Sequence, residues 1–370
     1  MADISRFADE LGPAKIIQVH EPSVGLKAVL VVDNVAIGPA LGGVRMAPDV
    51  STEECFRLAR AMTLKNAAAG LAHGGGKVVL YGDPNMPKPD KARLIRALAC
   101  SLRREREYIF APDMGTDEEC MAWIKDEIGR VVGLPARLGG IPLNTIGATG
   151  WGVCQAAEVA LPYCDFGFEN ARMVIQGFGA VGQHAARFLA AKKGVLVGVS
   201  DSRGAICCED GLDVDELCRL KAAGKSVTAY PKGTKLDRDA VINCDCDILI
   251  PAARPDVVTA DNVQHIKARL IIQGANIPFT LEAEKYLHDK GILCVPDFIA
   301  NAGGVICAAM EYRGESAAAV FDEIAEKVRY NTHLVLEEAK TKNILPREAA
   351  FRLAIQRVKE AMSYKRWSIF

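Results

Sequence analysis

Two lysines, Lys65 and Lys77, stand in an otherwise apolar segment with the sequence MTLKNAAAGLAHGGGKVVLYGDP. Met62 lies three residues before Lys65, so the two side chains share a face if this segment is helical. Three glycines then lead to Lys77 at the start of a predicted strand. A lysine held near another cation and apolar side chains can act as a base near neutral pH, so the segment is a candidate catalytic site. Two surface lysines beside a flexible turn are the alternative.

A candidate acid lies in the segment APDMGTDE, where Asp113 precedes a predicted helix. We expect Thr116 to cap that helix, with Glu119 completing a capping box. A carboxylate that capping does not use is available for another function. A solvated loop aspartate is the alternative.

A glycine pattern typical of dinucleotide binding occurs in QGFGAVG, where Gly177, Gly179 and Gly182 have GxGxxG spacing. The pattern follows a predicted strand and opens a predicted helix, whose first turn would hold Ala180 and Val181. Glycines at these positions let the backbone approach a pyrophosphate at the helix N-terminus. The segment therefore predicts a dinucleotide-binding domain.

The cofactor prediction depends on Asp201, which follows the glycines by about 20 residues at the end of the next predicted strand. A carboxylate there can bond ribose hydroxyls and repels a 2′-phosphate, which favours NAD. Arg203 could pair with that phosphate, so NADP is possible.

The elements around these residues predict an α/β fold with two domains. Short buried strands such as RMVIQ and CDILIPA alternate with helical segments, which is typical of a doubly wound parallel sheet. The segment GPALGGVRMAP reads as a glycine-rich loop between a strand and a helix, and GLPARLGGIPLNTIG as a linker. We expect a first α/β domain over residues 1–145, a Rossmann domain over 146–325, and C-terminal helices over 326–370.

Composition excludes several other classes of protein. The 45 Lys and Arg balance 46 Asp and Glu among 370 residues, which leaves no basic surface for nucleic acid or for membrane lipid. No apolar run approaches the roughly 20 residues of a membrane span, and the amino terminus lacks the apolar stretch of a secretory signal. The twelve cysteines are scattered, so we expect reduced thiols in a cytoplasmic protein and no metal site.

Taken together, these segments resemble the glutamate, leucine, phenylalanine and valine dehydrogenases. LAHGGGKVVLYGDP fits the family signature, and GPALGGVRMAP, APDMGTDE, ATGWGV, QGFGAVGQ and PDFIANAGGVI follow in the family's order. The resemblance covers nearly the whole chain. It implies NAD(P)-dependent oxidative deamination of an L-amino acid to a 2-oxo acid and ammonia by a homo-oligomer. The first domain would bind substrate and build the oligomer, the second would bind the cofactor, and the site would lie in the cleft between them.

The resemblance also implies roles for individual residues. Lys65 would hold the substrate α-carboxylate, Lys77 would activate water, and Asp113 would exchange protons with the substrate amino group and with water. The residues expected beside the nicotinamide, or between it and the substrate, are Thr149, Asn276 and Asn301.

Two positions bear on the substrate. In family members that use glutamate, the position of Leu41 is a lysine and that of Ala308 is a serine, and both read the side-chain carboxylate. A buried carboxylate without a partner costs roughly several kcal/mol, so we expect an apolar substrate such as leucine, valine or phenylalanine. The residues expected to bind that substrate, besides Lys65 and Asn301, are Leu41, Gly42, Met62, Ala111, Val305 and Ala308.

Two other functions stay open. ATGWGV, VSDSRGAI and the GAN before Pro278 look more like the glutamate branch, so a glutamate dehydrogenase with a rebuilt pocket is one alternative. Arg45 or another cation would then enter the site. The other is a nucleotide-binding regulatory protein that has lost catalysis, against which the intact Lys65, Lys77 and Asp113 argue.

Overall fold

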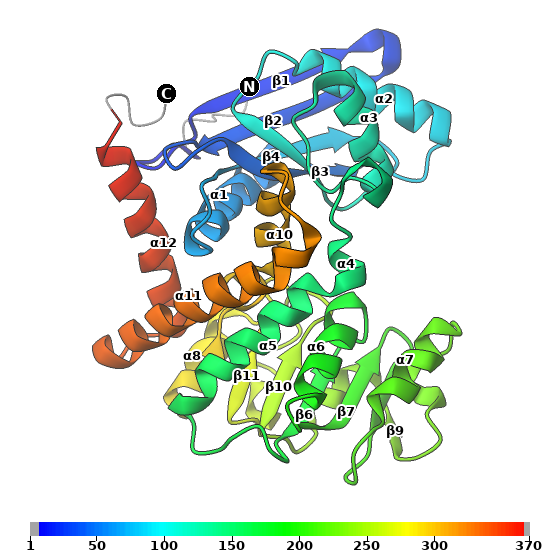
Figure 1. The fold of residues 1–370 in the computed structure, drawn as a ribbon, viewed down its shortest axis with the longest axis vertical. Helices are drawn as coiled ribbons and strands as arrows, with labels where there is room; N and C mark the ends of the chain where they lie inside the picture. Colours follow the sequence, from blue (N-terminus) through cyan, green and yellow to red (C-terminus); the bar gives the residue numbers. More distant parts are fainter. Residues whose placement is uncertain (1–6, 366–370) are drawn as a thin grey trace. The chain divides into compact units, whose positions relative to one another are not determined.

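The structure is a computed structural model that describes residues 7–365, and the chain divides into two compact units. The first holds Met1–Pro142, Val305–Ala319 and Phe351–Phe370, and the second holds Leu143–Gly304 and Val320–Ala350. Helices α10 (Gly303–Tyr312) and α12 (Pro346–Ser363) each begin in the second unit and continue in the first, whereas α11 (Val320–Lys342) belongs to the second. Figure 1 shows both units, with labels on most of their helices and strands.

The first unit is built on a five-stranded mixed sheet with the order β1-β2-β4-β3-β5. Pairs β1–β2 and β2–β4 are antiparallel, and pairs β3–β4 and β3–β5 are parallel. The strands are β1 (Lys15–Glu21), β2 (Leu26–Asn34), β3 (Ala40–Ala47), β4 (Gly74–Tyr81) and β5 (Tyr108–Pro112). The main helices are α1 (Thr52–Ala68), α2 (Lys88–Ser101) and α3 (Glu118–Ile128).

Both faces of this sheet are covered, which explains the nearly continuous apolar sequence of β2. Leu30 and Val32 face the larger core with residues of α2 and α3, whereas Val29 and Val31 face a smaller core with Phe56 of α1. Alternate residues of a strand point to opposite faces, so a strand between two helical layers needs apolar residues at every position.

The second unit holds a seven-stranded sheet with the order β12-β11-β10-β6-β7-β8-β9. Neighbours from β12 to β7 are parallel, and β8 and β9 add an antiparallel edge. The strands are β6 (Arg172–Gln176), β7 (Val195–Asp201), β8 (Gly204–Cys207), β9 (Thr234–Leu236), β10 (Ile248–Pro251), β11 (Leu270–Ile272) and β12 (Leu293–Val295). The helices besides α11 are α4 (Leu143–Ile146), α5 (Ala148–Ala160), α6 (Ala180–Ala190), α7 (Val214–Ala222), α8 (Leu281–Asp289) and α9 (Asp297–Ala300). The expected Rossmann-like α/β fold is confirmed.

Two predictions of local structure were wrong, and a third, about the cysteines, is corrected in the next paragraph. GPALGGVRMAP is not a loop, because Ala40–Ala47 forms β3 between β4 and β5. Thr116 does not cap α3; Asp117 accepts the Cys120 N–H instead, and Thr116 donates to the Val44 carbonyl at 2.8 Å. The predicted cap of α1 is confirmed, since Ser51 accepts the Glu54 N–H.

The cysteines supply the third correction. Cys207 and Cys244 form a disulfide, because the end of β8 lies beside the segment that follows the 3₁₀ helix Arg238–Asn243. The other ten cysteines are free thiols. Among the described residues, no helix is long and apolar enough to cross a membrane.

Candidate active site

Lys77 and Asp113 form an ion pair, with Lys77 Nζ 2.6 Å from Asp113 Oδ2. Lys77 lies within β4 and Asp113 directly follows β5; β3 separates these two strands in the sheet. Gly43 of β3 makes the meeting possible, since a Cβ there would come within 3.3 Å of Lys77 Nζ. Lys77 is 5 % exposed, so the alternative of a surface lysine beside a flexible turn is wrong for this residue.

The three glycines before Lys77 belong to β4 and bring α1 close to the sheet. A Cβ at Gly75 would lie 1.9 Å from the backbone nitrogen of Thr63, so only glycine lets α1 approach this closely. Lys65 and Met62 are on α1 as expected, and both are half-buried. Lys65 therefore lies on α1 and Lys77 on β4, two elements of the first unit that pack together.

The carboxylate of Asp113 is held by two cations. Arg45 Nε lies 3.1 Å from Oδ2, the same oxygen that Lys77 contacts. Burial by itself raises the pKa of Asp113, but the charges of Lys77 and Arg45 outweigh burial and keep this pKa below its usual value. Asp113 is therefore a carboxylate, able to accept a proton, at neutral pH.

Leu41 lies in a small apolar cluster within the first unit. Its side chain is 1 % exposed and packs with Ile109 and Val132, while Ala111 and Ala308 pack partly buried against them. The structure thus brings together Leu41, Ala111 and Ala308, three of the predicted substrate contacts. Met62 and Val305 are half-buried and are not members of this cluster. The backbone carbonyl of Gly42, another predicted substrate contact, accepts a hydrogen bond from the Tyr108 hydroxyl at 2.6 Å.

The glycine pattern of the second unit has the expected local geometry. Gly177 has a φ of +100°, Gly179 is the N-cap of α6, and a Cβ at Gly182 would lie 2.0 Å from the Gly177 carbonyl oxygen. Ala180 and Val181 form the first turn of α6. The N-terminus of α6 therefore offers backbone N–H groups to an anion.

Two of the three residues predicted beside the nicotinamide, Asn276 and Asn301, are hydrogen-bonded to each other in the second unit. Asn301 Nδ2 donates to Asn276 Oδ1 at 2.9 Å and lies 3.3 Å from the Gly274 carbonyl. Thr149 is in the first turn of α5, near Gly304. Asn301 thus links Asn276 to the segment that follows β11, and the two side-chain amides lie side by side.

Asp201 ends β7 as predicted, but protein donors already occupy its carboxylate. It accepts from Lys221 Nζ at 2.8 Å, Ser226 Oγ at 2.9 Å and the N–H groups of Arg203 and Val227. Burial raises the pKa of Asp201, but the hydrogen bond from Lys221 and the other donors outweigh it and lower this pKa. The predicted contact with the ribose stays a prediction.

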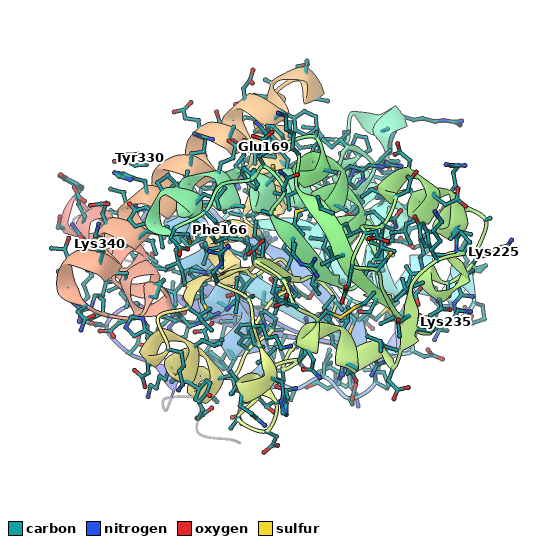
Figure 2. The ribbon with its side chains drawn as sticks, turned by 90° about the horizontal axis from the view of Figure 1, so that it is seen from below. Phe166, Glu169, Lys225, Lys235, Tyr330 and Lys340 are labelled. Carbon is teal, nitrogen blue, oxygen red and sulfur yellow. A yellow bond between two sulfur atoms is a disulfide. The ribbon has the colours of Figure 1, made fainter. Side chains whose placement is uncertain are left out.

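Sequence reasoning missed several of these partners. Glu54, which holds Arg45 at 2.6 Å, was recognised only as part of a cap, and Lys221 and Ser226 were not singled out. The contact of Glu54 with Arg45 and the contacts of Lys221 and Ser226 with Asp201 join segments that are separated in the sequence. No rule based on residue spacing predicts such contacts. Figure 2 shows Lys225 and Lys235, exposed lysines of the region around Ser226 and β9.

Family models match almost the whole chain. The model described as "Glutamate/Leucine/Phenylalanine/Valine dehydrogenase" covers residues 139–366, and the one described as "Glu/Leu/Phe/Val dehydrogenase, dimerisation domain" covers residues 13–130. The chain belongs to this family of NAD(P)-dependent amino acid dehydrogenases, which confirms the resemblance seen in the sequence.

Individual relatives agree with this assignment. The chain is 36 % identical over 359 residues to a glutamate dehydrogenase of Aeropyrum pernix, covering 90 % of this chain and 85 % of the relative. It is 35 % identical over 350 residues to an NADP-specific glutamate dehydrogenase of Saccharolobus shibatae, covering 89 % and 82 %.

Solved structures are similar over the same length. The hetero-hexameric glutamate dehydrogenase of Thermus thermophilus in a leucine-bound form has 29 % identity and a TM-score of 0.82, covering 94 % of this chain and 89 % of that one. The L-tryptophan dehydrogenase of Nostoc punctiforme has 25 % identity and a TM-score of 0.76, covering 95 % and 97 %. The named relatives thus act on both acidic and apolar amino acids.

Proposed function

We propose that this enzyme reversibly deaminates an L-amino acid with an apolar side chain, giving the 2-oxo acid and ammonia. Lys65 would bind the substrate α-carboxylate, and Asp113 would accept a proton from the substrate ammonium group. Bound NAD(P) supplies the hydride acceptor. Lys77 would then activate a water molecule against the substrate iminium carbon, after which the C–N bond breaks and ammonia leaves.

The buried Lys77–Asp113 pair is the observation that carries the chemistry. A lysine that is 5 % exposed and 2.6 Å from a carboxylate can pass protons between water and the amino group without exposure to bulk solvent. The N-cap of α3 is Asp117, so the carboxylate of Asp113 does not cap that helix. This argues against a regulatory protein that has lost catalysis.

The apolar cluster around Leu41 is the observation that favours an apolar substrate. Leu41, Ile109, Val132, Ala111 and Ala308 offer no charge or hydroxyl to a second carboxylate. Arg45, the cation that could have read such a carboxylate, is already engaged by Asp113 and Glu54. A γ-carboxylate placed against this cluster would lose its hydration without gaining a partner.

Glutamate is the second candidate substrate, and the comparisons support it better than an apolar amino acid. Both curated relatives described above are named glutamate dehydrogenases, at 36 % and 35 % identity. The two candidates differ in one physical requirement, because glutamate needs a cation at its γ-carboxylate.

A substrate panel tests this proposal. The enzyme would be assayed with leucine, valine, phenylalanine, tryptophan and glutamate, each with NAD and with NADP, by following reduced-cofactor absorbance. We expect kcat/KM for the best apolar amino acid to exceed that for glutamate by about 10²-fold or more, since an unpaired buried carboxylate costs a few kcal/mol. A preference for glutamate would replace the apolar proposal with the second candidate.

Lys77→Ala is the control for catalysis by the proposed residues. Loss of a general base typically lowers turnover by about 10²- to 10⁴-fold. Cofactor binding measured by fluorescence in the same variant separates this loss from misfolding. We also propose a homo-oligomer. The family description of a dimerisation domain supports it, and the hetero-hexameric relative of Thermus thermophilus supports assembly of such chains into oligomers.

A further inference from the structure

Arg45 joins the end of one strand to the start of a helix. It lies on β3, with Nε 3.1 Å from Asp113 Oδ2 and Nη1 2.6 Å from Glu54 Oε1 in the first turn of α1. Its side chain is 22 % exposed. The guanidinium therefore bridges two carboxylates, one of which belongs to the proposed catalytic pair.

Both cations near Asp113 lie on the same carboxylate oxygen. Lys77 Nζ and Arg45 Nε are 2.6 Å and 3.1 Å from Oδ2. Two cations on one oxygen restrain rotation of the carboxylate and favour its charged form. Lys77 would take part in proton transfer, so its charge would vary during the reaction, whereas arginine keeps its charge throughout.

We propose that Arg45 is a positioning residue for the reaction, which fixes the orientation of Asp113 and keeps it charged beside Lys77. Glu54 holds the guanidinium in place from the other side. This inference rests on the proposed roles of Lys77 and Asp113 in catalysis. Arg45 then acts through Asp113 and does not read the substrate side chain.

The charged and titratable groups around Asp113 come from four elements. They include Arg45 of β3, Glu54 and Cys55 of α1, Lys77 of β4 and Tyr108 of β5. Burial raises the pKa of Cys55 to about 12 and that of Tyr108 well above its ordinary value, so both stay neutral in an assay from pH 5 to 9. The variants Arg45→Gln and Glu54→Gln therefore each remove one charge near Asp113, while Cys55 and Tyr108 stay neutral.

The test is the pH dependence of kcat/KM, whose acid limb reports the group that must lose its proton in the free enzyme. In Arg45→Gln the Lys77–Asp113 pair loses a neighbouring cation. Loss of a proton from the pair then becomes less favourable, so the acid limb should move to higher pH by about 1 pH unit. In Glu54→Gln the amide oxygen can still accept from Arg45, but the opposing negative charge is gone. The limb should then move to lower pH, by a smaller amount.

Two further variants separate positioning from general stability. Arg45→Lys keeps the charge but cannot bridge both carboxylates in the same way, so the limb should stay near that of the wild type while kcat falls. Arg96→Gln is the matched control, since Arg96 is also an arginine bound to two carboxylates, Asp126 and Glu127, but on the surface of α2. Its acid limb should not move.

An acid limb in Arg45→Gln within about 0.2 pH unit of wild type would overturn the inference, since loss of a close charge shifts a pKa by more than this. A shift in the same direction in Arg45→Gln and Glu54→Gln would overturn it too, and Glu54→Gln gives a result even if Arg45→Gln does not fold. Failure of the proposed function looks different, because then Lys77→Ala would retain activity or no L-amino acid would be oxidised.

Discussion

At Gly43 the absence of a side chain decides whether two charged residues can meet. An added Cβ would come within 2.7 Å of Asp113 Cβ and 3.3 Å of Lys77 Nζ. The backbone of Gly43 does not have a positive φ, so space and not conformational freedom explains the glycine. Gly43, which has no functional side chain, therefore leaves the space in which Lys77 and Asp113 meet across β3.

Leu41 and Ala308 give the sharpest prediction at the scale of single residues. Leu41→Lys with Ala308→Ser places a cation and a hydroxyl in the apolar cluster, where a γ-carboxylate could pair with them. We expect the ratio of kcat/KM for glutamate to that for the best apolar amino acid to rise about 10²-fold or more. The measurement is the same substrate panel, applied to both single variants and the double variant.

The single variants supply the controls for this pair. Leu41 is 1 % exposed, so Leu41→Lys alone buries a charge against Ile109 and Val132 and should lower the melting temperature. Ala308 is half-buried, so Ala308→Ser by itself should change the melting temperature little. If the double variant folds and still prefers apolar amino acids by the original ratio, this cluster packs the core and does not select the substrate.

Among the elements, the sequence predicted best those whose pattern is local. The strands and helices of the second unit follow from alternating buried runs and from the glycines before α6, and the cap at Ser51 follows from a four-residue pattern. Lys65, Lys77 and Asp113 were singled out from their residue types and neighbours. The ion pair between Lys77 and Asp113 was not predicted, because it depends on β3 lying between β4 and β5.

The strand β3 was missed for a physical reason. ALGGVRMA contains two adjacent glycines, which weaken strand propensity and usually indicate a turn. In the folded chain those glycines are required by close neighbours, since a Cβ at Gly42 would lie 1.8 Å from the Gly76 carbonyl oxygen. Tertiary crowding, which the sequence does not display, therefore decides the conformation of this segment.

The turn after β7 carries a prediction about stability. Asp201 bonds four donors and has a lowered pKa, so its charged form stabilises the fold above its unfolded pKa of about 3.9, and this contribution is lost as pH falls through the folded value. Asp201→Ala leaves Lys221 and the Val227 N–H without this partner. We expect a loss of about 1–3 kcal/mol at pH 7, measured by urea unfolding, that shrinks toward pH 3.

A matched control and a second readout separate stability from cofactor choice. Asp165→Ala removes an exposed aspartate paired with Arg269, so it should cost little at any pH. The ratio of kcat/KM for NAD to that for NADP in Asp201→Ala tests whether Asp201 lies beside the adenosine ribose of the cofactor. If the ratio falls, Asp201 also repels the 2′-phosphate; if stability does not change at pH 7, the four hydrogen bonds do not hold the turn in solution.

At the scale of the whole molecule, each unit has its own apolar core. The core of the first unit gathers residues of β2 to β5, α2 and α3, and that of the second gathers residues of β6, β7, β10 and β11. The proposed cofactor residues Gly177, Gly179 and Gly182 all belong to the second unit. Units with separate cores can unfold separately, so a ligand held by one unit should stabilise that unit more than the other.

Two tryptophans allow this to be measured, since Trp123 lies on α3 of the first unit and Trp151 on α5 of the second. The measurement uses two reporter variants, one that keeps only Trp123 and one that keeps only Trp151. Trp367, which lies outside the described residues, is replaced in both. With NAD or NADP at about 100 times its Kd, a gain near 2.7 kcal/mol is expected, which corresponds to a rise of about 5–10 °C in the Trp151 melting transition. The Trp123 transition should rise by less. Equal rises would contradict separate unfolding, and a larger rise at Trp123 would contradict placement of the cofactor on the second unit.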